Sequence, residues 1–93
     1  MDHVSHDAER GDLQVPLDVI KRLAVNDSGF VFDPVSGESF STNDTGRAIL
    51  RLACTERDPR RIARLLTEQF DVELGVCERE VLEFIAVLRR FGS

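Results

Sequence analysis

The chain has 93 residues, of which 42% are hydrophobic and 31% are charged, and its formal net charge at pH 7 is −5. This length fills one hydrophobic core, the composition is that of a globular domain rather than a disordered chain, and no run reaches the roughly 18 apolar residues of a membrane span. The negative charge opposes binding to nucleic acid unless a local basic patch overrides it.

The N-terminal segment, residues 1–14, is polar and acidic and shows no apolar periodicity. Because nothing in it can be buried to offset the entropy of ordering it, we expect a flexible tail before a folded domain at residues 15–93. His3 and His6 are three residues apart, but such a tail would not hold them for a metal ion. The segment also lacks the pattern of a secretory signal, so we expect a cytoplasmic protein.

The stretch from Val15 to Val25 precedes a cluster of turn-forming residues at positions 26–29. Its apolar residues include Ile20 and Leu23. Apolar residues that end at a turn cluster are typical of a strand, so this stretch predicts a first strand with ragged ends.

A hairpin is predicted next. Residues 30–32 are aromatic and β-branched, and the proline and glycine within residues 33–37 suit a tight connection. The second arm, residues 38–41, alternates polar and apolar side chains, which directs Phe40 toward the core and the two flanking serines to the other face. This short, polar arm is a candidate sheet edge.

After residue 42 the apolar period changes from two to about 3.6, which predicts three helices. Asn43 is a good N-cap for the first helix, which should end near Thr55, and Gly46 in its first turn suggests close packing. Asp58 followed by Pro59 predicts the start of the second helix.

The third helix should begin between Leu74 and Glu78 and end near Gly92. Its apolar stripe comprises Cys77, Val81, Phe84, Ile85, Leu88 and Phe91. Leu82 and Ala86 lie to one side of that stripe. This wide apolar flank is either ordinary core or partly the wall of a groove.

Several motifs, in their order and spacing, resemble the PqqD family. They are residues 28–34 (SGFVFDP), residues 37–46 with an Asn-x-x-Gly helix start, and Ile49-Leu50. The resemblance continues through the two later helices and covers roughly Ile20 to Gly92. It implies an α+β, winged helix-turn-helix-like fold with a three-stranded antiparallel sheet followed by three helices.

The resemblance implies a peptide chaperone that binds the leader segment of a ribosomally made precursor and presents it to a modifying enzyme, often a radical S-adenosylmethionine protein. In such proteins the leader joins the third strand and lies against the third helix. Two positions depart from the family: Thr42 stands where a leucine is usual, and the chain stops at Ser93 where a further apolar residue is usual. Both favour the general peptide-binding role over pyrroloquinoline quinone (PQQ) synthesis in particular.

An edge strand offers unpaired backbone N–H and C=O groups to an extended peptide, while side-chain pockets select its sequence. The same open edge permits a monomer or a weak homodimer. Short polar edges also protect a sheet from aggregation, so a purely structural interpretation stays open. On the third helix, three residues spaced i, i+3 and i+7 are candidates for one wall of the cleft. The candidate peptide-binding residues are Glu38, Ser39, Phe40, Ser41 and Thr42 on the strand and Leu82, Ile85 and Arg89 on the helix.

Three alternatives remain. A DNA-binding winged helix would use the chain's only concentration of positive charge, although interspersed acidic residues favour a solvated helix face. This concentration comprises Arg47, Arg51, Arg57, Arg60, Arg61 and Arg64. An enzyme is disfavoured because both histidines lie in the tail and neither Cys54 nor Cys77 has a histidine nearby in sequence. Without Cys-x-x-Cys spacing, we expect both cysteines to be reduced and buried, with no metal, cofactor or catalytic residue. The third alternative is an adaptor subunit that binds a folded protein.

Overall fold

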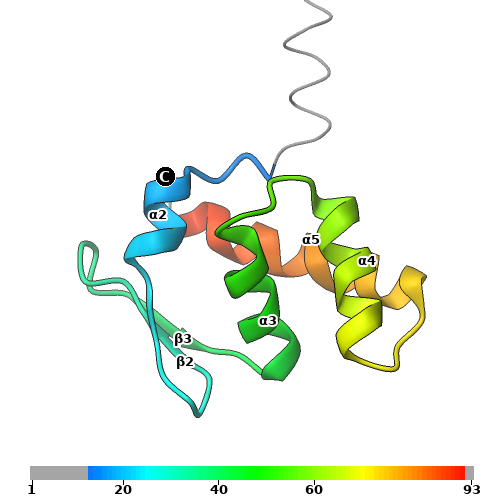
Figure 1. Cartoon of the computed structure of the whole chain (residues 1–93). Coiled ribbons are helices and arrows are strands. Elements are labelled where there is room, and N and C mark those ends of the chain that lie inside the picture. Colours follow the sequence, from blue (N-terminus) through cyan, green and yellow to red (C-terminus); the bar gives the residue numbers. More distant parts are fainter. Residues whose placement is uncertain (1–12, 92–93) are drawn as a thin grey trace, which may run out of the picture.

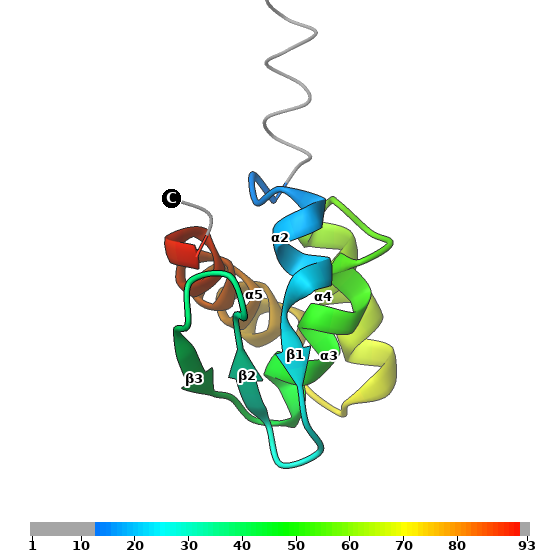
Figure 2. The same ribbon diagram turned by 90° about the vertical axis from the view of Figure 1, so that its left-hand side faces the viewer.

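Three short strands form an antiparallel sheet at one end of the molecule, and the helices lie to one side of it (Figures 1 and 2). The computed structural model describes residues 13–91. In chain order the elements are α2 (Leu17–Arg22), β1 (Ala24–Val25), β2 (Phe30–Phe32), β3 (Ser39–Ser41), α3 (Asp44–Ala53), α4 (Pro59–Gln69) and α5 (Leu74–Phe91). The predicted α+β class with a three-stranded antiparallel sheet is confirmed, whereas the winged-helix arrangement stays a prediction.

The prediction of a strand across Val15–Val25 is wrong for most of that stretch, where a short helix precedes the sheet. Helix α2 begins after Pro16, whose carbonyl accepts from the N–H groups of Val19 (3.1 Å) and Ile20 (3.3 Å). These two adjacent side chains are buried, and the last turn carries basic residues that suit a helix C-terminus. Only Ala24–Val25 is strand.

The core begins earlier in the chain than the sequence suggested. Leu13 and Val15 are 0% and 1% exposed and join the main apolar cluster. Arg89 donates to the Leu13 carbonyl (3.2 Å), and Arg57 donates to the Val15 carbonyl. The expectation that nothing before residue 15 can be buried is therefore wrong at Leu13, while residues 1–12 lie outside the described residues.

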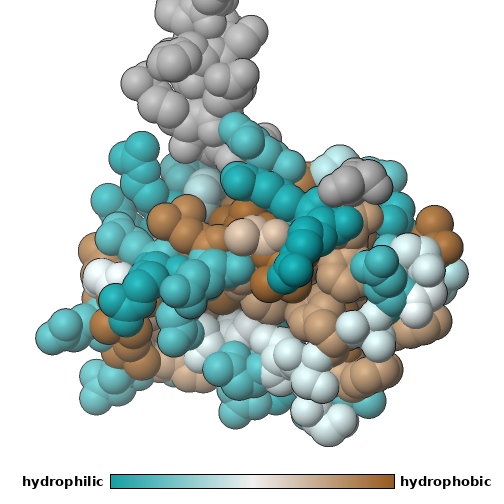
Figure 3. Space-filling model, turned by 180° about the vertical axis from the view of Figure 1, so that it is seen from behind, coloured by the Kyte–Doolittle hydropathy of each residue, from teal (hydrophilic) through white to brown (hydrophobic). Residues whose placement is uncertain are grey.

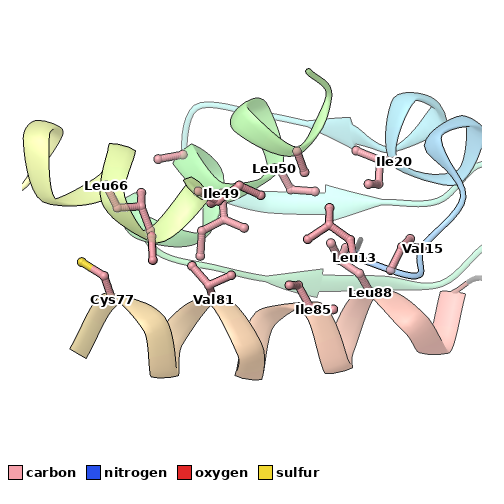
Figure 4. Close-up of a cluster of buried hydrophobic side chains, with 14 of the residues drawn as sticks. Leu13, Val15, Ile20, Ile49, Leu50, Leu66, Cys77, Val81, Ile85 and Leu88 are labelled. Atoms are coloured by element: carbon pink, nitrogen blue, oxygen red, sulfur yellow. The ribbon is translucent and has the colours of Figure 1, made fainter. Parts of the chain in front are cut away.

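One face of α5 forms one side of this core. Cys77, Val81, Ile85 and Leu88 are buried and point toward α3, α4 and the sheet (Figure 4). Opposing side chains come from each of the other helices and from β2. They are Val19, Ile20, Val31, Ala48, Ile49, Leu50, Ala53, Ile62, Ala63 and Leu66. The stripe predicted for the third helix is confirmed at its four buried positions.

Both predicted helix caps are present. The Asn43 side chain accepts from the Gly46 N–H (2.9 Å), and the Asp58 side chain accepts from the Arg60 N–H (3.0 Å). Each cap satisfies a backbone donor that a helix start would otherwise leave unpaired. The caps fix where β3 gives way to α3 and where α4 begins.

An ion pair ties the hairpin to both ends of the described chain. Arg22 donates to both carboxylate oxygens of Asp33, at 3.0 Å each, and also to the carbonyl of Phe91 (3.3 Å). Asp33 is fully buried and accepts further from the Val35 N–H and the Ser36 hydroxyl. The Arg22–Asp33 pair therefore holds α2, the β2–β3 turn and the end of α5 together.

This pairing makes the fold sensitive to acid. The hydrogen bonds from Arg22 lower the pKa of Asp33 from 3.8 to about 2, against the opposing effect of burial. Because the folded pKa lies below the unfolded one, the stabilisation is fully present above about pH 4 and is lost as the pH falls through 2. We expect the free energy of unfolding to decrease across that window, and urea titrations at several pH values measure it. The variant Asp33→Asn should lack this pH-dependent part of the stability. If the free energy of unfolding of that variant decreased with acid as steeply as that of the wild type, Asp33 would not be its source.

Among the helices of residues 13–91, none has the length and apolar character required to cross a lipid bilayer.

Candidate functional site

Strand β3 lies at one edge of the sheet. The strand order is β1-β2-β3, so β3 pairs with β2 on one side and, within residues 13–91, with no strand on the other. Figure 2 shows β3 as the outer strand, with α5 behind it. The segment just before α3 is therefore open to a further strand.

The ladder between β2 and β3 identifies which backbone groups face this opening. Thr42 N–H donates to the Gly29 carbonyl (2.7 Å) and Asp33 N–H donates to the Glu38 carbonyl (2.8 Å), at the two ends of the paired segment. In an antiparallel pair, residues that are hydrogen-bonded to the partner strand alternate with residues whose N–H and C=O groups point away from that strand. Ser39 and Ser41 fall at the alternate positions. Their N–H and C=O groups therefore face the open edge.

A groove runs between β3 and α5. One hollow of about 470 Å³ lies at its α3 end, and a second of about 260 Å³ lies at its hairpin end. Val87 of α5 lines both hollows, so they follow one another along the strand. The first is lined by Ser41, Thr42, Asn43, Gly46, Ile49, Glu80, Glu83, Phe84 and Val87, and the second by Glu38, Ser39, Phe40, Val87, Arg90 and Phe91.

Aromatic rings form the apolar part of the groove. The Phe40 ring lies 6.0 Å from Phe84 in an edge-on arrangement and 5.3 Å from Phe91, measured between ring centroids. All three rings are half-buried and pack against the core. As the sequence predicted, Phe40 faces inward while its two serine neighbours are exposed. The groove thus has a preformed apolar surface that is still accessible.

Glycines permit two close approaches at the α3 end of the groove. Gly29, at φ +90°, lies where an added Cβ would be 2.1 Å from the Thr42 carbonyl oxygen. A Cβ at Gly46 would be 1.8 Å from the Thr42 hydroxyl oxygen and 3.0 Å from the Phe84 ring. The close packing predicted at Gly46 is therefore present, and Thr42 is held between the two glycines.

Charge differs between the two ends of the groove. The α3 end carries Glu80 and Glu83, whereas the hairpin end carries both Glu38 and Arg90. On the face seen from behind, hydrophobic residues lie interspersed with hydrophilic and near-neutral ones (Figure 3). The surface suits an elongated, amphipathic guest better than a wholly apolar one.

The structure brings the five strand candidates, Glu38 to Thr42, into this groove, but not the three helix candidates. Leu82 is 60% exposed and lies beside Pro59 and Arg60. Ile85 is buried in the core at 1% exposure. Arg89 donates to the Leu13 carbonyl.

The rotation of α5 explains this difference. Successive residues of a helix turn by about 100°, and the buried stripe through Val81 and Ile85 fixes which way the helix faces. One flank of that stripe, containing Phe84 and Val87, then faces β3. The opposite flank contains Leu82 and Arg89. Sequence reasoning identified Phe84 as part of the stripe but missed Glu80, Glu83 and Val87, whose only signal was their position on the same flank.

Contacts within the chain engage several of the arginines considered for DNA binding. Arg47 pairs with Asp44 (2.7 Å), Arg61 lies 3.8 Å from Glu56, and Arg57 donates to Val15. These contacts favour a structural role for three of the six side chains.

Potential metal ligands and thiols were the reactive groups that the sequence offered for an enzyme or a metal site. Residues 13–91 contain no cluster of three or more potential metal-ligating side chains, and Cys54 and Cys77 are both free thiols. Burial raises the pKa of Cys77, which keeps this thiol protonated. Cys54 is only half-buried, so the expectation of two buried thiols holds for Cys77 alone.

Comparisons with known proteins agree on one relationship. The family described as "Coenzyme PQQ synthesis protein D (PqqD)" matches residues 29–92. Among solved structures, "Lasso peptide synthetase B1 complexed with the leader peptide" is similar at a TM-score of 0.62 with 30% sequence identity, over 75% of this chain and 84% of that one. No curated protein gave a significant match.

Proposed function

Since the chain belongs to the PqqD family, we propose that it is a peptide chaperone, which binds the leader segment of a ribosomally made precursor and presents it to a modifying enzyme. The similar lasso peptide synthetase structure contains a leader peptide, which supports this role. The guest peptide would extend the sheet beyond β3 and place alternate side chains against α5.

The observation that carries the proposal is that, among residues 13–91, no strand pairs with the outer edge of β3, which lies directly beside a groove. The outward-facing backbone groups of Ser39 and Ser41 offer main-chain hydrogen bonds, which give affinity without sequence selection. The groove, whose two hollows are lined by Phe84 and Val87 and by Phe40 and Val87, offers the side-chain contacts that select the sequence. Both are needed to recognise an extended peptide.

In this proposal the chain has no catalytic role, binds no cofactor and acts in the cytoplasm, and the covalent chemistry belongs to a partner such as a radical S-adenosylmethionine enzyme. The pathway is PQQ synthesis or a related peptide maturation. Because a flexible leader loses entropy when it becomes ordered, we expect micromolar affinity, about −8 kcal/mol.

A titration of the ¹⁵N-labelled full chain with a candidate leader tests the site. We expect amide shifts concentrated in Ser39–Thr42 and in the part of α5 between Glu80 and Val87, because these segments border the groove. Shifts confined to α4 would contradict this placement. Salt-dependent retention on duplex DNA without leader binding would instead support the DNA-binding alternative.

A further inference from the structure

We infer that the groove selects a peptide in which an apolar side chain and a lysine or arginine are two residues apart, with the basic side chain at the α3 end. This inference rests on the proposed function and names the class of peptide that the same groove takes. It follows from the strand geometry together with the different surroundings of Phe40 and Thr42.

The strand geometry sets the spacing. Side chains of residues directly opposite one another in a sheet lie on the same face, and successive side chains alternate between faces. Phe40 faces inward and Thr42 is two residues further along, so peptide residues opposite them both point toward α5. The peptide residue between them, opposite Ser41, points outward. Two inward side chains separated by one outward residue therefore enter the groove together.

The position opposite Phe40 is apolar. Rings of Phe84 and Phe91 flank Phe40 at 6.0 and 5.3 Å, and the half-buried Val87 lies where the two hollows meet. An aliphatic or aromatic guest side chain here would bury apolar surface that is exposed in the free chain. This contact anchors the peptide.

The position opposite Thr42 is polar and negatively charged. Glu80 and Glu83 line this hollow from adjacent turns of α5, together with Thr42 and Asn43. No arginine or lysine lines it, and within residues 13–91 neither glutamate joins an ion pair or accepts a side-chain hydrogen bond. Two like charges three residues apart on a helix repel, and a guest ammonium or guanidinium would relieve that repulsion.

The hairpin end does not share this preference. Arg90 and Glu38 line it together, so its charges are mixed. Charge selection therefore acts at one end of the groove only, which also fixes the orientation of an amphipathic peptide.

A selection from displayed 12-residue random peptides tests the inference with the full chain as bait. Peptides that also bind a Ser41→Pro variant are discarded, so that only edge binders remain. We expect enrichment of sequences with Lys or Arg two residues from an apolar residue. One selected peptide is then synthesised with that basic residue and with Gln in its place, and both are titrated against the wild type, E80Q/E83Q and E68Q/E78Q.

The double variant E80Q/E83Q should weaken the basic peptide about 3- to 10-fold and leave the Gln peptide unchanged. The variant E68Q/E78Q removes two negative charges away from the groove, because Glu68 is exposed on α4 and Glu78 lies on the opposite flank of α5, so it should change neither. Equal losses in both double variants, or edge binders without a basic preference, would overturn this inference alone. If no peptide depends on Ser41, the proposed function itself fails.

Discussion

Replacement of Ser41 by proline is expected to weaken leader binding at least about tenfold while the domain stays folded. The Ser41 N–H faces away from β2, so the substitution removes no bond of the domain's own sheet. Proline is tolerated on an edge strand where the N–H faces outward. A guest strand, however, would lose a main-chain hydrogen bond, keep an unpaired carbonyl and clash with the proline ring. The summed free-energy cost of these three effects exceeds the roughly 1.4 kcal/mol that corresponds to a tenfold change in affinity.

The other edge of the sheet supplies a matched control. Asn26 N–H donates to the Phe30 carbonyl (3.0 Å), so the alternation places the Val25 N–H on the outer side of β1. Val25→Pro should therefore perturb the fold about as much as Ser41→Pro but leave leader binding intact. Fluorescence anisotropy with a labelled leader measures binding, and circular dichroism measures folding. Equal affinity in Ser41→Pro and the wild type would exclude strand addition at β3.

Gly29→Ala is expected to lower the melting temperature by more than about 10 °C. An alanine there would adopt φ +90°, which costs roughly 1–2 kcal/mol in the left-handed region, and its Cβ would overlap the Thr42 carbonyl oxygen. That oxygen belongs to the backbone and cannot move without shifting the junction between β3 and α3. The substitution thus disrupts the hairpin and the α3 end of the groove together.

Gly37→Ala separates the cost of the positive φ from the cost of the overlap with Thr42. Gly37 also has positive φ (+80°), but an added Cβ would find no atom within 4 Å. Gly37→Ala should cost only the roughly 1–2 kcal/mol of the positive-φ backbone, at roughly 4–8 °C per kcal/mol in a domain of this size, and therefore less than Gly29→Ala. Thermal unfolding of both variants by circular dichroism makes the comparison, and similar losses would rule out the overlap with Thr42 as a cause.

The sequence predicts best where a local signal decides the structure. The Asn43 and Asp58 caps, the turn glycines and the alternation around Phe40 depend on residues close in the chain, and the structure has each of them. The order of strands and helices from residue 30 onward follows from these signals alone.

The errors lie where tertiary packing decides. Val15 to Val25 contains β-branched residues typical of a strand, yet the need to bury Val19 and Ile20 on one side favours a short helix. Leu13 stands between the polar residues Asp12 and Gln14, and only its packing into the folded core makes its burial favourable. The wide apolar surface of α5 suggested that the helix forms one wall of a groove. Which flank of α5 faces β3, however, depends on how the helix is rotated against α4, and the sequence does not give this rotation.

The shortness of β3 limits what its backbone can do for a guest. Only two residues, Ser39 and Ser41, present outward N–H and C=O groups before the chain turns into α3 at Asp44. A longer edge would let a bound strand slip by two residues at little cost, since the same faces stay inward. Here a slipped strand would lose a large share of its few ladder bonds. In the proposed complex, the short edge would therefore hold the guest strand in one register, and that register would set the number of residues between the bound segment and the residue that the partner enzyme modifies.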